Sequence, residues 1–147
     1  MGMTLSEFGL LALETAVLFI ASTVVFDVLH LLLHRWTKSR FALLRLFGGW
    51  HDAHHQFLDQ QVRIQDTHAR ANLIYHMVPE YLVAMAALIP AFLVADARAV
   101  LATMAIHTVM FGFRLAGKGL DVNHRTVEQI QNPHLPLVVQ PDYHFLH

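Results

Sequence analysis

The sequence lacks cysteine and has few charged residues, and each absence excludes whole classes of protein. Without cysteine there are no disulfide bonds, no thiolate metal sites and no iron–sulfur clusters. Charged residues make up only 14% of the 147-residue chain, about half of the share that is usual in soluble domains. The net charge of −1 leaves no basic excess for binding nucleic acid. There is no His-Glu-x-x-His motif, so a zinc protease has no support.

The chain is rich in apolar residues, and many of them form long segments. Three of them run over residues 8–33, 71–95 and 99–113. At about 1.5 Å per residue, the first is long enough to cross a hydrocarbon layer roughly 30 Å thick. The break Asp96-Ala97-Arg98 predicts that the second and third form a helical hairpin. Residues 41–47 are typical of a short interfacial helix that ends at Gly48-Gly49. We therefore expect a single all-α integral membrane domain over residues 1–147.

The distribution of Lys and Arg predicts the orientation of these segments. Six of the ten follow the first segment and three follow the third, whereas only Arg98 lies in the hairpin turn. Three spans place the two basic regions on the same side of the membrane, and the positive-inside rule makes that side cytoplasmic. A soluble helical bundle with unusually apolar helices is the alternative.

Histidine is the over-represented residue, with twelve copies. His30 and His34 are spaced i, i+4, which places both on one face of a helix. The run His51-Asp-Ala-His54-His55 places three more on one face of a second helix. The remaining members of this set lie near the end of the chain, at His124, His144 and His147. All eight fall on the predicted cytoplasmic side. Imidazole is the commonest protein ligand for metals, and eight are too many for one four-coordinate ion, so we interpret them as ligands of two ions.

These motifs resemble those of the fatty acid hydroxylase/sterol desaturase superfamily. Its members carry HxxxH, HxxHH and a final HxxHH motif on the cytosolic side of a helical membrane domain, and the matching stretches here are 30–34, 51–55 and 144–147. Three further stretches are similar to the sterol-desaturase branch: 123–127, 141–147, and 66–70 followed by 76–80. The final motif lacks its last histidine because the sequence stops at His147. We therefore expect either a truncation within this motif or the loss of one ligand.

The resemblance implies about three to four membrane spans below a cytoplasmic cap that holds two iron ions. It implies O2-dependent hydroxylation or desaturation of an aliphatic C–H bond in a lipid. Zinc is expected to be able to replace iron in the purified protein. By motif match, the ligands are His30, His34, His51, His54, His55, His124, His144 and His147. His76, in the altered stretch 76–80, is a candidate for a further ligand.

Other polar residues have less specific interpretations. Four carboxylates are candidates for orienting the ligand imidazoles: Asp52, Asp66, Glu80 and Asp142. Asp142 fits the N-cap of a last helix equally well. Glu14 lies within the first apolar segment, where an acidic group suggests a function, although it is close enough to the outer boundary to reach water. His107 lies about 13 Å into the membrane by helix rise, so we expect a hydrogen-bonded packing residue away from the metal ligands.

The partners follow from the same interpretation. The bilayer and a lipid substrate are expected, and nucleic acid is not. No flavin, haem or cluster motif is present, so electrons must come from an external donor of the ferredoxin or cytochrome type, docked on the basic face. A homo-oligomer that supplies further spans is an open alternative. The main competing function is a non-catalytic metal-binding or metal-transport membrane protein. Transport sites usually lie near the middle of the bilayer, unlike these histidines. A soluble zinc-binding helical bundle is a third reading.

Overall fold

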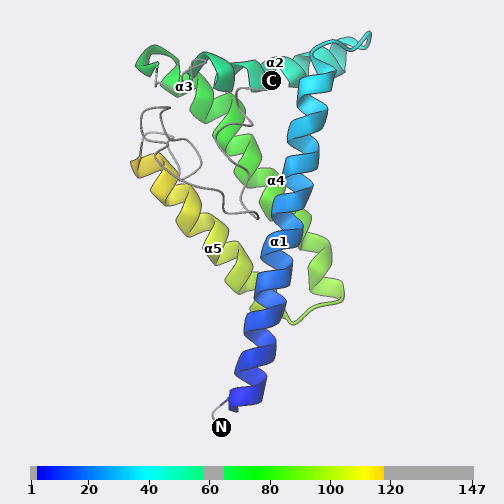
Figure 1. Ribbon diagram of the computed structural model, residues 1–147, viewed down its shortest axis with the longest axis vertical. Coiled ribbons are helices and arrows are strands. Elements are labelled where there is room, and N and C mark those ends of the chain that lie inside the picture. The colour runs from blue at the N-terminus through cyan, green and yellow to red at the C-terminus, as the bar shows by residue number, and fades with distance from the viewer. Residues whose placement is uncertain (1–2, 58–64, 118–147) are drawn as a thin grey trace, which may run out of the picture.

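The computed structural model describes residues 3–57 and 65–117, and these are helical apart from short connections (Figure 1). The helices are α1 (Leu5–Trp36), α2 (Ala42–Phe57), η1 (Asp66–His68), α3 (Ala69–Asn72), η2 (Leu73–Met77), α4 (Val78–Leu88), η3 (Ile89–Leu93) and α5 (Ala97–Ala116). The predicted all-α class is therefore confirmed for this part of the chain. His124, Asp142, His144 and His147 lie outside the described residues.

Three helical segments are long and apolar enough to cross a membrane. They are Leu5–Trp36, Asp66–Leu93 and Ala97–Ala116, and they contain most residues of the three predicted apolar segments. Many of their large apolar side chains are exposed, including Leu10 at 68%, Leu13 at 62% and Phe113 at 73%. Such wide apolar exposure is rare on proteins surrounded by water and is expected where lipid is the solvent.

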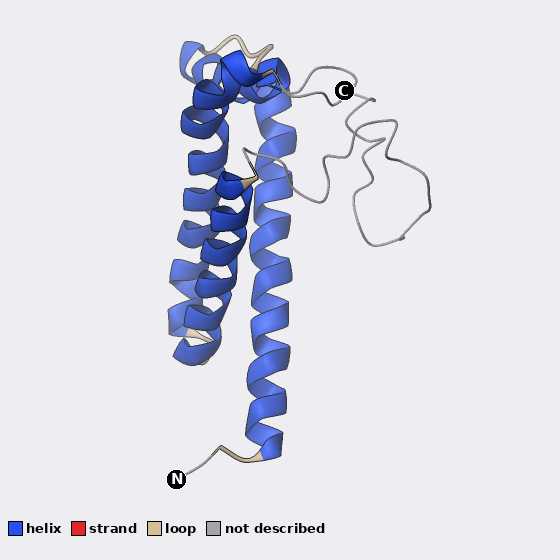
Figure 2. Ribbon diagram, turned by 90° about the vertical axis from the view of Figure 1, so that its left-hand side faces the viewer, coloured by secondary structure: helices blue, strands red, loops and turns tan. Residues whose placement is uncertain are grey.

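The second and third of these segments form the predicted hairpin beside α1, and α1 extends beyond its turn (Figure 2). The Asp96 side chain caps α5 by accepting a hydrogen bond from the backbone N–H of Arg98 at 2.8 Å. Its hydrogen bonds with the Arg98 guanidinium hold the pKa of Asp96 at about 2. The carboxylate of Glu14 accepts a hydrogen bond from the backbone N–H of Asp96 at 3.0 Å. Glu14 therefore fastens the hairpin turn to α1, which gives this acidic residue of the first apolar segment a structural role.

α1 and α5 approach each other closely through small side chains. Ala99, Val100 and Thr103 are each 0% exposed, and the Thr103 hydroxyl lies 3.3 Å from the carbonyl oxygen of Thr15. Further along the contact, His107 lies with its Nε2 atom 2.8 Å from the Ser22 hydroxyl, and its ring stacks on Phe19. The prediction that His107 is a hydrogen-bonded packing residue is confirmed.

The prediction that a helix ends at Gly48-Gly49 is wrong. α2 continues through both glycines to Phe57 and lies across the end of α1 (Figure 1). A Cβ atom built on Gly48 would lie 2.5 Å from the backbone nitrogen of Thr37, whereas nothing lies within 4 Å of one built on Gly49. Gly48 therefore allows the backbones of the two helices to touch at a sharp corner, and it does not terminate the helix.

The second of the three long apolar segments, Asp66–Leu93, is irregular where it meets α2. Its residues 73–77 form a π-helix, and Pro79 follows two residues later. Proline removes one helical hydrogen bond, and its ring clashes with the carbonyl four residues earlier, here that of Tyr75. The wider π turn relieves this clash, and such turns are frequent at functional sites. It is also the turn that carries His76.

Candidate metal centre

Six histidines from three separate elements lie together at the end of the bundle that α2 covers. They are His30 and His34 from α1, His51, His54 and His55 from α2, and His76 from η2. His51 is central: its ring centroid lies 4.3 Å from that of His30, 4.4 Å from that of His34 and 5.3 Å from that of His76. The structure therefore brings together the first two predicted histidine motifs and the additional candidate His76.

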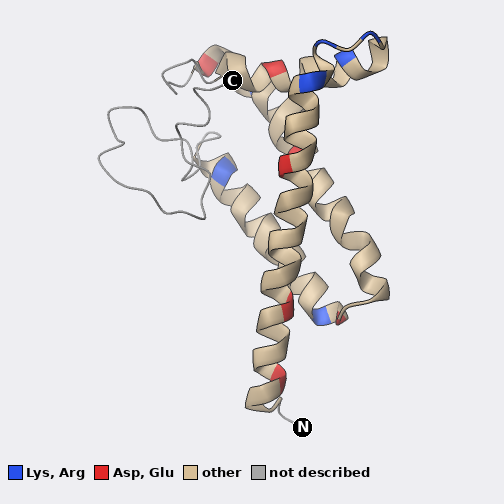
Figure 3. Cartoon of the chain, turned by 45° about the vertical axis from the view of Figure 1, so that its right-hand side comes forward, with Lys and Arg blue, Asp and Glu red and all other residues tan. Residues whose placement is uncertain are grey.

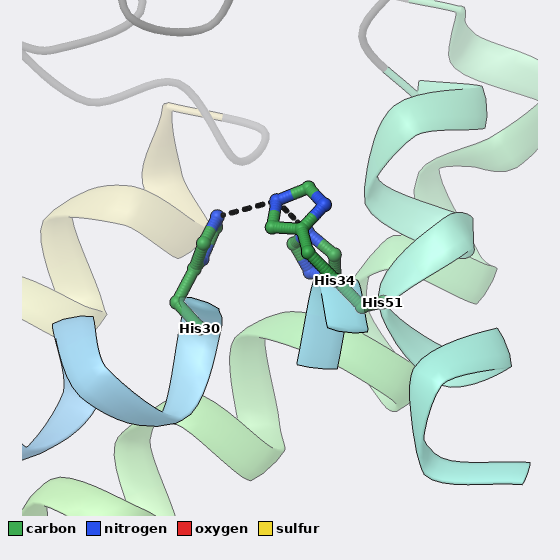
Figure 4. Close-up of side chains that lie close together, drawn as sticks. All are labelled: His30, His34 and His51. Atoms are coloured by element: carbon green, nitrogen blue, oxygen red, sulfur yellow. Dashed lines mark hydrogen bonds between the residues drawn. The ribbon is translucent and has the colours of Figure 1, made fainter. Parts of the chain in front are cut away.

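Four of these side chains direct their Nε2 atoms toward one another. Successive Nε2–Nε2 distances are 3.2 Å for His30 and His34, 3.1 Å for His34 and His51, and 3.0 Å for His51 and His55 (Figure 4 shows the first three residues). A neutral Nε2 atom carries either one proton or one lone pair. His34 and His51 each have two other Nε2 atoms close to their own Nε2 atom. One proton or one lone pair per Nε2 atom cannot form a good hydrogen bond with both neighbours at once.

The spacing fits the ligands of a metal ion. A metal–nitrogen bond of about 2.0–2.1 Å places neighbouring ligand atoms roughly 2.9–3.4 Å apart, depending on whether the geometry is octahedral or tetrahedral. The measured separations of 3.0–3.2 Å fall within this range. His30, His34 and His51 also present three nitrogen atoms that all lie within 4.8 Å of one another. These side chains therefore form a candidate site for a transition-metal ion.

A second group lies deeper, between α2 and the irregular helix. The rings of His54 and His76 stack with their centroids 4.0 Å apart, and both residues are almost fully buried. The side-chain oxygen of Asn72 lies 3.1 Å from Nδ1 of His54, and Asn72 is 1% exposed. An Nδ1–H donated to this oxygen leaves Nε2 of His54 as the lone-pair atom.

His76 is connected to α5 through an acidic residue. Its Nε2 atom lies 3.7 Å from the carboxylate of Glu80, one helical turn further along. The same carboxylate forms an ion pair with Arg114 at 2.7 Å, and both partners are mostly buried. Glu80, a predicted orienting carboxylate, thus lies beside a clustered imidazole and also holds the end of α5 against α4.

Burial favours the neutral, ligating form of the central imidazole. Removal from water lowers the pKa of His51, and the surrounding imidazoles of His30, His55, His34 and His54 lower it further. The Nδ1 atom of His51 is buried, and it has no hydrogen-bond partner among the residues that the structure describes. A neutral ring at neutral pH keeps a lone pair for a cation.

The structure does not bring every predicted residue to the cluster. Asp52 and Asp66 are exposed, and within residues 3–57 and 65–117 neither forms a hydrogen bond with an imidazole. Asn72 and Arg114 were missed by the sequence analysis. No local spacing indicates either residue. Asn72 meets His54 only because α3 packs against α2, and Arg114 meets Glu80 only because the hairpin folds back. Comparison of the chain with protein-family models, curated proteins and solved structures finds no match.

Proposed function

We propose that this protein is a membrane enzyme that holds two iron ions in its histidine cluster and oxidises an aliphatic C–H bond of a lipid with O2. The observation that carries the proposal is the convergence of six imidazoles from α1, α2 and η2 at one end of helices that are long and apolar enough to cross a membrane. Bound iron would supply O2 activation and removal of a hydrogen atom, which amino-acid side chains cannot provide.

The residues divide into two candidate ligand groups. His30, His34, His51 and His55 would hold one ion through the Nε2 atoms that approach one another. His54 and His76 would belong to the second ion, together with the predicted ligands His124, His144 and His147 outside the described residues. Asn72 and Glu80 would keep the second pair of rings in place.

The location of the cluster favours a substrate that arrives from the bilayer. Phe26 lies one helical turn before His30 on α1, and its ring meets those of His30 and His76 edge-on at 5.8 and 6.5 Å. The membrane side of the cluster is therefore apolar at this point. An alkyl chain could approach the imidazoles there without crossing water, and exclusion of water protects reactive species.

The proposal is tested by expressing the wild-type protein and His51→Ala in the same cells. Mass spectrometry of the lipids and measurement of iron in the purified proteins form the readout. We expect wild type to bind about two iron ions and to produce a lipid changed by one oxygen atom or by loss of two hydrogens. His51→Ala should lose most of both signals, because its ring lies at the centre of the cluster.

His68→Ala is the matched control, because His68 is a half-buried histidine of η1 and has no ring contact with the six clustered imidazoles. It should behave as wild type. If the lipid profiles of wild type and His51→Ala were identical and only wild type bound iron, the enzymatic proposal would be wrong. The protein would then be a non-catalytic metal-binding protein. Metal flux into vesicles containing wild type would instead support a transporter.

A further inference from the structure

A basic and apolar surface of exposed side chains lies where α1 turns into α2, beginning at Arg35, the residue that follows His34. Residues 35–47 contain four basic residues and no acidic residue; the nearest acids in the sequence are Asp27 and Asp52. We call the surface formed by Arg35, Lys38, Arg40, Phe41, Leu43 and Leu46 the basic corner. Figure 3 shows Lys and Arg concentrated at this end of α1.

The three cations of the basic corner are exposed and have no acidic partner in the described parts of the chain. The fourth basic residue, Arg45, is used internally, because its guanidinium donates to the carbonyl oxygens of Ser39 at 2.9 Å and Arg40 at 3.0 Å. These two bonds fix the backbone of the turn. Arg35, Lys38 and Arg40 are thus held on a defined backbone, and none of the acids in residues 3–57 and 65–117 neutralises their charges.

Large apolar side chains share the surface with these charges. Phe41 is 56% exposed, Leu43 is 63% exposed and Leu46 is 54% exposed. The Arg40 guanidinium lies 4.8 Å from the centre of the Phe41 ring, so a cation and an apolar side chain are directly adjacent. Apolar side chains at an acyl boundary beside cations at headgroup level are the pattern of a segment that lies in the membrane interface.

We propose that the basic corner binds the headgroups of anionic phospholipids in the leaflet on the histidine-cluster side. α1 ends at Trp36, so Arg35, Lys38 and Arg40 lie where that helix leaves the apolar layer. Cations at this level attract anionic headgroups, while Phe41, Leu43 and Leu46 contact the acyl chains. A soluble acidic protein would complement the charges, but it would leave these three apolar side chains without a partner.

The two tryptophans of the chain, Trp36 and Trp50, lie on α1 and α2 on either side of the turn and report on lipid contact there. The protein is reconstituted at low salt in vesicles that contain brominated phosphatidylglycerol or brominated phosphatidylcholine, whose bromine quenches tryptophan fluorescence. We expect wild type to prefer phosphatidylglycerol by roughly tenfold. The triple variant Arg35→Gln/Lys38→Gln/Arg40→Gln should bind both lipids equally.

Two comparisons make the test specific. Lys38→Gln removes one of three similar contributions to a roughly tenfold preference and should lower it about twofold. Arg70→Gln, which removes an exposed cation of α3, should leave it unchanged. Unchanged thermal unfolding of the triple variant shows that its fold is intact. An unaltered phosphatidylglycerol preference in that variant would overturn the proposal. If that variant instead accepted electrons more slowly from reduced ferredoxin, the corner would be a protein-docking surface.

Discussion

At the scale of single residues, polar side chains that are not predicted ligands hold the imidazoles of the cluster in place. A histidine ligand works only if the nitrogen that faces the ion carries a lone pair, and the hydrogen bond of the other nitrogen decides this. Asn72 accepts that hydrogen bond for His54. Glu80 lies beside His76 and is itself held by Arg114. These contacts restrict both the rotation and the protonation of the buried rings.

Asn72→Ala should weaken metal binding while leaving all six described imidazoles of the cluster in the protein. Loss of an orienting partner typically lowers metal affinity about 10- to 100-fold. Asn72→Asp keeps an acceptor oxygen opposite Nδ1 of His54 and should retain most of the affinity. Titration of the purified variants with iron under anaerobic conditions measures the difference. Equal affinity of Asn72→Ala and wild type would show that His54 needs no help from this side chain.

At the scale of helical elements, the α1–α2 corner and the π turn place the imidazoles. α1 supplies two of them near its end, and α2 must cross that end closely for His51 to reach His34. Gly48 makes the close crossing feasible, because any Cβ would meet the backbone of Thr37. The π turn then brings His76 against His54 from the opposite side.

The two adjacent glycines offer a matched test of the corner. Gly48→Ala should destabilise the protein by about 1–3 kcal/mol, the usual cost of inserting a methyl group where there is no room. Gly49→Ala has open space around its Cβ and should raise stability by about 0.5–1 kcal/mol, because glycine is unfavourable within a helix. Thermal unfolding in detergent measures both effects. Gly48→Ala should also lower the iron content, and equal melting temperatures for the two variants would contradict the close crossing.

At the scale of the whole molecule, the turn that carries Asp96 and the histidine cluster lie at opposite ends of the bundle (Figure 1). The distribution of Lys and Arg predicts that the histidine end faces the cytoplasm. Because the chain contains no cysteine, single cysteines can be introduced as labels without first removing native ones.

Ala97→Cys and Ser39→Cys provide the test of orientation. In intact cells, a maleimide that cannot cross membranes should label the cysteine at position 97 and leave the one at position 39 unlabelled. After the cells are permeabilised, both should react. The reverse pattern would place the cluster on the outer side and remove the argument for a cytoplasmic electron donor. Labelling of both sites in intact cells would show that positions 97 and 39 do not lie on opposite sides of the membrane.

Periodicity and composition were sufficient to predict the long helices and which histidines share a helix face. They were not sufficient to predict how the helices pack against one another. Apolar segments of membrane length and the i, i+3, i+4 spacing of His51, His54 and His55 are local properties, so the sequence alone specified them. Packing decided the rest. Gly48 has the local pattern of a helix end, but its contact with the backbone of Thr37 gives it a different role. Asn72 and Arg114 have their roles only because distant segments come together. Close contact depends on the relative placement of elements, which a linear pattern does not contain.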